Sequence, residues 1–591
     1  MEMKDMEMPT IIKAMELELN DIEIMGDEQF HKNQCKNLVE NFKKGLQGVE
    51  AIVGVHVHTL QPILEDFSQI IVKVKWLIKN CSKNWKKVIL MQRCSQETFR
   101  ELLLELQWFY NMIYEVVFKR GLCQKLEVNG CNKFEPCGLK DVADDERLLF
   151  QKLKNMVDSV PNDSSTFKLI NYILEWQSCI QKFECGAEEF MSFPTNFAEP
   201  NYKEKLYESM GVVVYVTTWL DFESITKIIT FGSVEAKVRL EKEAHILSCL
   251  NHPNIIKVFY CAIKVNSNHR GEIIIGMEKG DMSLFKLLCD NQSLKMSFLH
   301  KIDVMIQIAN AMLYLHDMKM AHHGLKPQNV VIVNFDMDKI KKNSFIHVKL
   351  IDFGISKVEV NGDERPTNQG IYGIPHYIAP KVRYPINQVN SFKADVFSFG
   401  ILCCDILTSV ANKWDYRDSS IYVKKRLKSL CKFDHRLQLM IKECLDIRYP
   451  SKRPSFLEIV KSLMEVKKYF LEDELIKNEK MIFNSNISIG KNLVRHLQDW
   501  IINIYKLPKH RCISNNEMSN EYINISNDTP YIYDSNIDKY LKKKNKYSSL
   551  QLKFLELKKL LLKNNMVGIV GMAGIGKSTL VKAFKEHIEK K

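Results

Sequence analysis

A series of short motifs in a fixed order, in the middle of the chain, constrains the fold more than any other feature. The most specific is HVKLIDFGISK, in which an apolar, strand-like run is followed by Asp352, Phe353 and Gly354. A DFG tripeptide is common by chance, but this one follows an apolar strand and lies 23 residues after Asn329 in HHGLKPQN. The other landmarks are HPNII, GIPHYIAPK, DVFSFG and CLDIRYPSKRPSFLEI. Their order predicts one folded unit over residues 205–475.

This unit resembles the tyrosine-kinase-like branch of the protein kinase superfamily, over a little under half of the chain. The resemblance implies a bilobal α+β fold with a small β-rich lobe and a larger helical lobe. It also implies ATP and Mg²⁺ in the cleft, and transfer of the γ-phosphoryl group to Ser, Thr or Tyr. Lys326 and Asn329 match the catalytic loop of the family, and Asn329 and Asp352 match its magnesium ligands.

The catalytic loop departs from the family at the proton acceptor. In the family pattern H-R-D-L-x-x-x-N, an Asp takes the proton of the substrate hydroxyl, and Gly324 stands at that position. A general base is worth about 10²- to 10⁴-fold in rate, so we expect impaired phosphoryl transfer. His322 or His323 can substitute in principle, because a neutral imidazole accepts a proton near pH 7. In the family, however, the first His of the loop packs inward.

Two further departures concern the activation segment. His323 replaces the Arg with which many kinases bind a phosphorylated activation segment, so we expect weak switching by phosphorylation. Lys381 replaces a Glu that in the family pairs with an Arg, which corresponds to Arg453 here. We therefore expect a like-charge contact and a loosely held segment.

The nucleotide-binding part of the small lobe is also altered. Glycine-rich loops let backbone amides approach phosphates, but only Gly211 remains, while Leu206 and Glu208 occupy the places of the two earlier glycines. We therefore expect weakened ATP affinity. By counting from the strand, the family's third-strand lysine corresponds to Lys227, with Glu243 as its ion-pair partner. The gatekeeper and hinge correspond to Met277, Glu278 and Gly280.

Helical periodicity dominates the region before this unit. Apolar residues recur every three or four positions from Leu60 to Ile78 and again from Phe99 to Val117, which places them on single helix faces. We predict an all-α helical bundle over residues 31–192. A mobile N-terminus is predicted at 1–30 and a linker at 193–204.

Two functions of the predicted bundle stay open. It can dock signalling proteins, or it can act as a membrane-perturbing effector controlled by the kinase fold, as in mixed-lineage kinase-like pseudokinases. The sequence contains no motif that separates these alternatives.

The C-terminal part is predicted to contain a flexible linker at 476–549 and an incomplete nucleotide-binding segment at 550–591. MVGIVGMAGIGKSTL combines an apolar strand, a G-x-x-x-x-G-K-S loop and the start of a helix, which is the context of a Walker A loop. The glycines expose backbone amides to the β-phosphate, the lysine neutralises phosphate oxygens, and the serine supplies a magnesium ligand. The candidate residues are Gly571, Gly576, Lys577, Ser578 and Thr579. The segment resembles the start of an NB-ARC module, here a truncated α/β segment, which would bind ATP or ADP if complete.

Composition excludes several other classes of protein. The net charge is +13, and residues 541–591 contain thirteen Lys against three Glu, or 13 − 3 = +10. No aromatic platform accompanies these lysines, so we expect no nucleic-acid binding, and an acidic membrane surface is a weaker alternative to a solvated helix face. The 16 cysteines have no zinc or disulfide spacing. No apolar run reaches the roughly 18 residues of a membrane span, so we expect a cytoplasmic protein.

Three functions therefore remain. The first is an intracellular signalling protein whose kinase-like domain binds ATP, transfers phosphate poorly and acts as a nucleotide-dependent scaffold or regulator of protein partners. The second is an active Ser/Thr kinase with protein substrates, and the third is the helical effector described above. The oligomeric state cannot be predicted.

Overall fold

The computed structural model describes most of the chain up to residue 486 and two short strands beyond it. The described ranges are 9–23, 30–53, 60–83, 86, 90, 96–119, 134–184, 193–194, 197–209, 211–265, 270–289, 296–333, 346–352, 357–358, 377–379, 391–409, 419–486, 521–524 and 567–570. The chain divides into two compact units, Met1–Lys477 and Asn478–Lys591.

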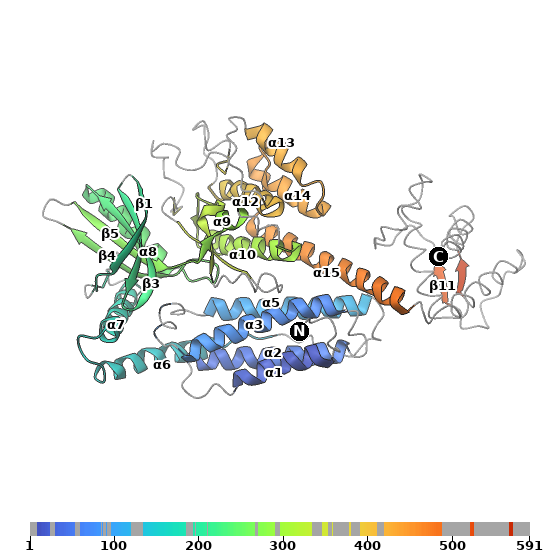
Figure 1. Ribbon diagram of the computed structural model, residues 1–591, viewed down its shortest axis with the longest axis horizontal. Helices are drawn as coiled ribbons and strands as arrows, with labels where there is room; N and C mark the ends of the chain where they lie inside the picture. Colours follow the sequence, from blue (N-terminus) through green and yellow to red (C-terminus); the bar gives the residue numbers. More distant parts are fainter. Residues whose placement is uncertain are drawn as a thin grey trace, which may run out of the picture. The chain divides into compact units, whose positions relative to one another are not determined.

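Four helices of the N-terminal region share one apolar core (Figure 1). They are α1 (Pro9–Glu23), α2 (Lys32–Val53), α3 (Gln61–Lys83) and α5 (Gln96–Lys119). The two long apolar stripes that predicted helices face this core, because their residues from Leu60 to Ile78 and from Phe99 to Val116 are buried. The prediction of a helical N-terminal region is confirmed.

Helix α1 lies within residues 1–30, and the prediction that this segment is mobile is wrong for residues 9–23. Ile12, Met15, Leu19 and Ile22 recur at intervals of three and four residues and are buried in the shared core. This stripe was visible in the sequence.

The next two helices do not join this core. They are α6 (Leu139–Val157) and α7 (Ser165–Glu184). α7 packs in a second core with strand residues such as Trp219. The carboxylate of Asp145 in α6 accepts hydrogen bonds from the backbone N–H groups of Asn33 and Gln34 at the start of α2, each at 3.0 Å. The predicted single bundle over 31–192 is thus corrected, because α7 packs its apolar face against the sheet and α6 and not against the core of α1, α2, α3 and α5.

The small lobe is a five-stranded antiparallel sheet with the strand order β1-β2-β3-β5-β4. Its strands are β1 (Asn201–Ser209), β2 (Val212–Trp219), β3 (Phe222–Phe231), β4 (Val258–Val265) and β5 (Gly271–Glu278). Between β3 and β4 lies α8 (Val234–Cys249), which begins where the Ser233 side chain accepts a hydrogen bond from Ala236 N. β1 begins inside the predicted linker 193–204, so that linker is shorter than expected.

A tyrosine of α7 binds the outer edge of this sheet. The Tyr172 hydroxyl accepts a hydrogen bond from Cys261 N at 3.1 Å and donates one to Cys261 O at 3.3 Å. β4 is an edge strand, and edge backbone groups need such partners when they are covered. Tyr172 therefore joins α7 to the small lobe through main-chain groups as well as through apolar packing.

Replacing Tyr172 with Phe is expected to lower the free energy of unfolding by about 1 kcal/mol, because two buried hydrogen bonds are lost while the ring remains. Urea denaturation measures this change. Tyr207→Phe is the matched control, since Tyr207 is 56% exposed. Equal stability of the two variants would contradict the structural role of the Tyr172 hydroxyl.

A mainly helical lobe follows, with its apolar core around α10 and α12. Its helices are α9 (Leu284–Cys289), α10 (Phe298–Asp317), α12 (Ser391–Thr408), α13 (Ser419–Ser429), α14 (His435–Cys444) and α15 (Phe456–Asn486). Its short strands are β6 (Met282–Ser283), β7 (Met320–Ala321), β8 (Val330–Val333), β9 (His347–Leu350) and β10 (Lys357–Val358). Among the described helices, none is long and apolar enough to cross a bilayer.

The second unit contributes two parallel strands, β11 (Glu521–Asn524) and β12 (Val567–Val570). β12 coincides with the apolar strand predicted before the Walker A loop. β11 lies inside the predicted flexible linker 476–549, and α15 also extends into it, so that linker is not uniformly irregular. The Walker A candidates Gly571, Gly576, Lys577, Ser578 and Thr579 lie outside the described residues.

Candidate nucleotide and catalytic site

The small lobe places Lys227 opposite the acid of the DFG motif. Lys227 lies in the middle of β3, paired with Val214 of β2 and Ile275 of β5, and its side chain is 17% exposed. Its Nζ is 3.2 Å from Asp352 Oδ1. The residue placed by counting along the sequence thus lies in contact with the proposed magnesium ligand.

Asp352 is held as a carboxylate. Burial alone raises the pKa of this group, but the charge and hydrogen bond of Lys227, with smaller contributions from Lys326 and His322, bring it below the ordinary value. The backbone of Asp352 is left-handed, with φ of 65°, a conformation that non-glycine residues adopt at a cost.

The catalytic loop is anchored to α12 by one buried carboxylate. Asp395 has no exposed surface and accepts hydrogen bonds from His322 N and His323 N, both at 2.8 Å. It also lies 3.0 Å from His316 Nε2 at the end of α10. Burial raises the pKa of Asp395, but the hydrogen bond from His316 and the nearby histidines lower it below the ordinary value. The loop conformation, including the left-handed His323 with φ of 58°, therefore depends on this anion.

Gly324 lies between the magnesium-ligand candidates. Asn329 Nδ2 donates to Gly324 O at 2.7 Å, and Ile351 N donates to Asn329 O at 2.9 Å. A Cβ atom added at Gly324 would lie 3.3 Å from Asn329 Nδ2 and 3.6 Å from Asp352 O. A side chain at this position would thus stand beside both candidates, and the glycine leaves that place without an acid.

His322 is poorly suited to replace the missing base. Its ring is fully buried, and its Nδ1 accepts a hydrogen bond from Gly324 N at 3.1 Å. Burial also lowers the pKa of the imidazole. Because its accepting nitrogen is occupied inside the loop, His322 acts as a support, and His323 is the remaining candidate of the two.

The predicted hinge follows β5. Met277 pairs with Ile225 of β3 and Val258 of β4. The Glu278 carboxylate is buried and forms an ion pair with Lys349 of β9 at 2.6 Å. Its side chain therefore joins the hinge to β9 and is not available to bind a nucleotide.

Gly280 is required for close packing in this hinge, because an added Cβ would lie 2.7 Å from Val331 Cβ. Lys349 and Asp395 were not among the predicted site residues. A lone lysine in the apolar run HVKLI was the available signal for the first, and the acid of DVFSFG for the second.

Gly211 forms the turn between β1 and β2. Its φ of 79° favours glycine, and an added Cβ would lie 2.6 Å from Thr230 Oγ1. Glu208 of β1 forms an exposed ion pair with Lys205 at 2.6 Å. The prediction of weak ATP affinity stays a prediction.

Other candidates are only partly described. Glu243 lies in α8, but its side chain, like Phe353, Gly354 and Lys381, lies outside the described residues. Arg453 is buried, and its guanidinium donates to Asp446 O and Lys393 O. Burial lowers its pKa to about 10. The predicted contact between Lys381 and Arg453 is therefore untested.

The donor set fits Mg²⁺ and ATP in kind. Asp352 offers an ionised carboxylate and Asn329 an amide oxygen, both hard ligands of the type that Mg²⁺ binds together with nucleotide phosphates. Lys227 and Lys326 add positive charge beside them, as phosphate binding requires. Among the described residues, no cluster of three or more His, Cys, Asp or Glu side chains forms a separate metal site.

Comparison with known proteins agrees with this geometry. Residues 211–464 match the family model described as protein kinase domain. This part of the chain is a protein kinase domain. A putative serine/threonine-protein kinase of Acanthamoeba polyphaga mimivirus is 32% identical over 169 residues, which cover 28% of this chain and 56% of that protein.

Two cellular relatives have similar descriptions. A probable serine/threonine-protein kinase of Dictyostelium discoideum is 27% identical over 291 residues, covering 48% of this chain and 17% of its own length. A serine/threonine-protein kinase of Arabidopsis thaliana is 30% identical over 239 residues, covering 39% of this chain and 48% of its own length. The chain thus spans about half or less of each relative, and the similarity concerns the kinase domain.

Proposed function

We propose that this chain is a signalling protein whose kinase domain binds Mg²⁺ and ATP, transfers phosphate poorly and regulates protein partners through its nucleotide-bound conformation. The observation that carries this proposal is that the site contains candidate nucleotide-binding residues but no acid at the position of the proton acceptor. Lys227 contacts Asp352, and Asn329 donates to the main-chain carbonyl of Gly324, whereas Gly324 supplies no carboxylate for the substrate proton.

The residues present support binding more than proton transfer. Bound Mg²⁺ would neutralise phosphate charge, with Asp352 and Asn329 as its protein ligands. Lys227 would add a fixed positive charge at the phosphates, and the ion pair of Glu278 with Lys349 would hold the hinge. None of these groups accepts the proton of an incoming hydroxyl, so the attacking oxygen would remain a weak nucleophile.

Replacing Lys227 with Met is expected to weaken binding of Mg–ATP about tenfold or more, because a partly buried cation beside the phosphates is lost. Titration calorimetry with a non-hydrolysable ATP analogue measures the affinity. Lys442→Met, an exposed lysine of α14, is the matched control. A purified wild-type protein that binds no nucleotide at millimolar concentration would sink the proposal.

The second candidate function is an active Ser/Thr kinase with protein substrates, and the descriptions of the relatives favour it. It requires a proton acceptor other than an acid at position 324, and His323 is the residue to test. Phosphate transfer by the wild type that falls at least a hundredfold in His323→Gln would support this alternative.

The regions outside the kinase domain carry further proposals. We propose that the helical region docks signalling proteins in the cytoplasm, with the membrane-perturbing effector as its alternative. Leakage of liposomes caused by the full chain would favour the effector. For the segment after β12, we propose the start of an NB-ARC type P-loop module.

A further inference from the structure

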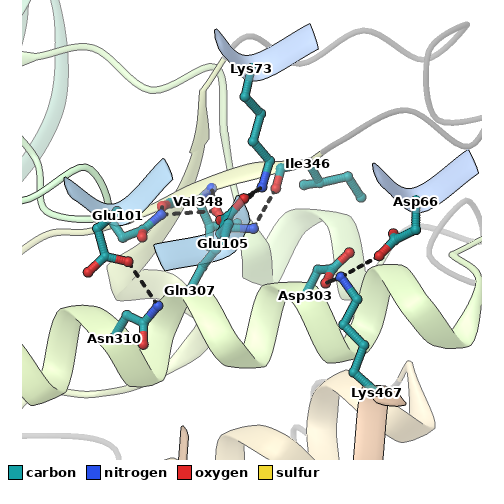
Figure 2. A network of polar contacts seen from close by, with 11 residues as sticks. Asp66, Lys73, Glu101, Glu105, Asp303, Gln307, Asn310, Ile346, Val348 and Lys467 are labelled. Atoms are coloured by element: carbon teal, nitrogen blue, oxygen red, sulfur yellow. Dashed lines mark hydrogen bonds and ion pairs between the residues drawn. The ribbon is translucent and has the colours of Figure 1, made fainter. Parts of the chain in front are cut away.

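A buried lysine joins the helical bundle, which consists of α1, α2, α3 and α5, to the kinase domain. Nζ of Lys467 in α15 lies 2.7 Å from Asp66 Oδ2 of α3 and 2.9 Å from Asp303 Oδ1 of α10 (Figure 2). It also lies over the rings of Trp108 and Phe109 of α5, at 5.7 and 5.2 Å from their centres. Its side chain is 10% exposed. The bundle and the kinase domain thus each contribute one carboxylate to a single cation.

The contact around Lys467 is partly apolar. Leu471 of α15 has no exposed surface and belongs to the core of the bundle, and Leu299 of α10 packs against that core. Lys468 forms an ion pair with Glu115 of α5. Removing one member of a buried ion pair is strongly unfavourable, because it leaves an uncompensated charge. The docking of the bundle therefore depends on the charges of this interface.

Helix α5 reaches the kinase domain at a second place. Asn310 Nδ2 of α10 donates to Glu101 Oε2 at 3.3 Å, as Figure 2 shows. His252 Nε2, in the loop before β4, lies 3.9 Å from Glu101 Oε1. Burial lowers the pKa of His252 to about 3, so this ring is neutral at physiological pH. The bundle thus contacts both α10 and the loop that leads into the small lobe.

The same two kinase elements support the strand that leads to Asp352. One turn before Asn310, Gln307 donates to Ile346 O at 2.8 Å and accepts from Val348 N at 3.0 Å. Asn254 lies two residues after His252. Its side-chain Nδ2 donates a hydrogen bond to Val348 O at 2.9 Å, and its main-chain carbonyl accepts one from Leu350 N at 2.8 Å. β9 is therefore fixed by α10 and by the loop before β4.

We propose that the docked bundle helps to position the residues of the nucleotide site, so that docking of the bundle and binding of Mg–ATP favour each other. The path runs from Glu101 through α10 and the loop before β4 to β9 and Asp352. In the docked arrangement, the side chains of Asp352 and Lys227 are in contact. The inference rests on the proposed function, namely that this site binds Mg–ATP. Because linkage is reciprocal, nucleotide must also tighten docking.

Two substitutions, one on each side of the interface, test the coupling. Lys467→Met keeps the apolar stem and removes the charge, and its control is Lys461→Met, exposed on the same helix. Asp66→Asn changes the bundle alone, and its control is Glu65→Gln, its exposed neighbour in α3. Hydrogen exchange of α3 and α5 and the affinity for the ATP analogue are measured on the full chain.

We expect both interface variants to speed exchange in α3 and α5 and to weaken analogue binding about 5- to 150-fold, the usual range of coupling between sites. The controls should match the wild type. In the wild type, the analogue with Mg²⁺ should slow exchange in α3 and α5, and Asp352→Asn should abolish that protection.

Three results separate the possible failures. Unchanged exchange in both interface variants would overturn the role of the lysine in docking. Faster exchange with unchanged nucleotide affinity would overturn the coupling. A wild type that binds no analogue, or an Asp352→Asn variant that binds as well as the wild type, would instead overturn the proposed function. If Lys467→Met fails to fold, Asp66→Asn decides alone.

Discussion

Replacing Gly324 with Asp is expected to raise the rate of phosphoryl transfer by about 10²- to 10⁴-fold, the usual contribution of a general base. The surroundings can accept the side chain, because an added Cβ would approach Asn329 Nδ2 to 3.3 Å, a contact that a small shift relieves. The new carboxylate would stand beside Asn329 and Asp352, where the proton of an incoming hydroxyl must be accepted. Transfer from labelled ATP to a protein substrate measures the gain.

Gly324→Asn is the matched control, since it has nearly the same size and cannot accept the proton as a carboxylate does. It should remain at the wild-type rate. If the wild type already transfers phosphate as fast as Gly324→Asp, the domain is an active kinase and the proposed impairment is wrong. If Asp352→Asn abolishes that transfer, the activity belongs to this site.

Replacing Asp395 with Asn is expected to lower the free energy of unfolding of the kinase domain by about 3 kcal/mol. The carboxylate accepts both N–H groups of His322 and His323, whereas an amide presents one NH₂ group to them and leaves a buried donor unsatisfied. Urea denaturation measures the loss. Because Asn329 and Asp352 are held by the same loop, affinity for the ATP analogue should fall as well.

The pH dependence of this variant gives a second measurement. The folded-state pKa of Asp395 is below its ordinary value, so its contribution to stability is present above the unfolded pKa of about 3.9 and is lost as pH falls through the folded value. The difference in the free energy of unfolding between the wild type and Asp395→Asn should have its full value at pH 6 and should decrease below about pH 4. A gap that stays constant down to pH 3 would contradict the anionic anchor. Asp317→Asn, at an exposed position at the end of α10 in the same lobe, is the control.

Much of the kinase domain could be predicted from local patterns. The stretch HVKLIDFG predicts a strand followed by the DFG acid. This acid, Asp352, contacts Lys227, which was located by counting alone. The long stripes of α3 and α5 were also readable, because a helix repeats its buried face every three or four residues. Short motifs and helix periodicity depend on residues that are close in sequence, so they can be recognised without knowledge of the fold.

Other features depend on which faces meet. The stripe of α7 looked like part of a bundle, yet it packs on the sheet beside Trp219. Glu278 was predicted from the hinge motif, but its ion pair with Lys349 depends on two strands of different sheets, β5 and β9, lying close together. Helix periodicity indicates that a face is buried and does not indicate its partner.

The protein kinase domain, the candidate magnesium ligands and the expected loss of the catalytic acid at Gly324 could all be predicted from sequence, because each lies in a short motif of fixed spacing. Two other features depend on the three-dimensional packing: His322 is occupied inside its loop, and Lys467 is a buried link between two parts of the chain. In sequence, Lys467 is one lysine among many in a polar helix. Its partners Asp66 and Asp303 come from distant elements, and charge pairing at such separations is set by packing, which no local pattern records.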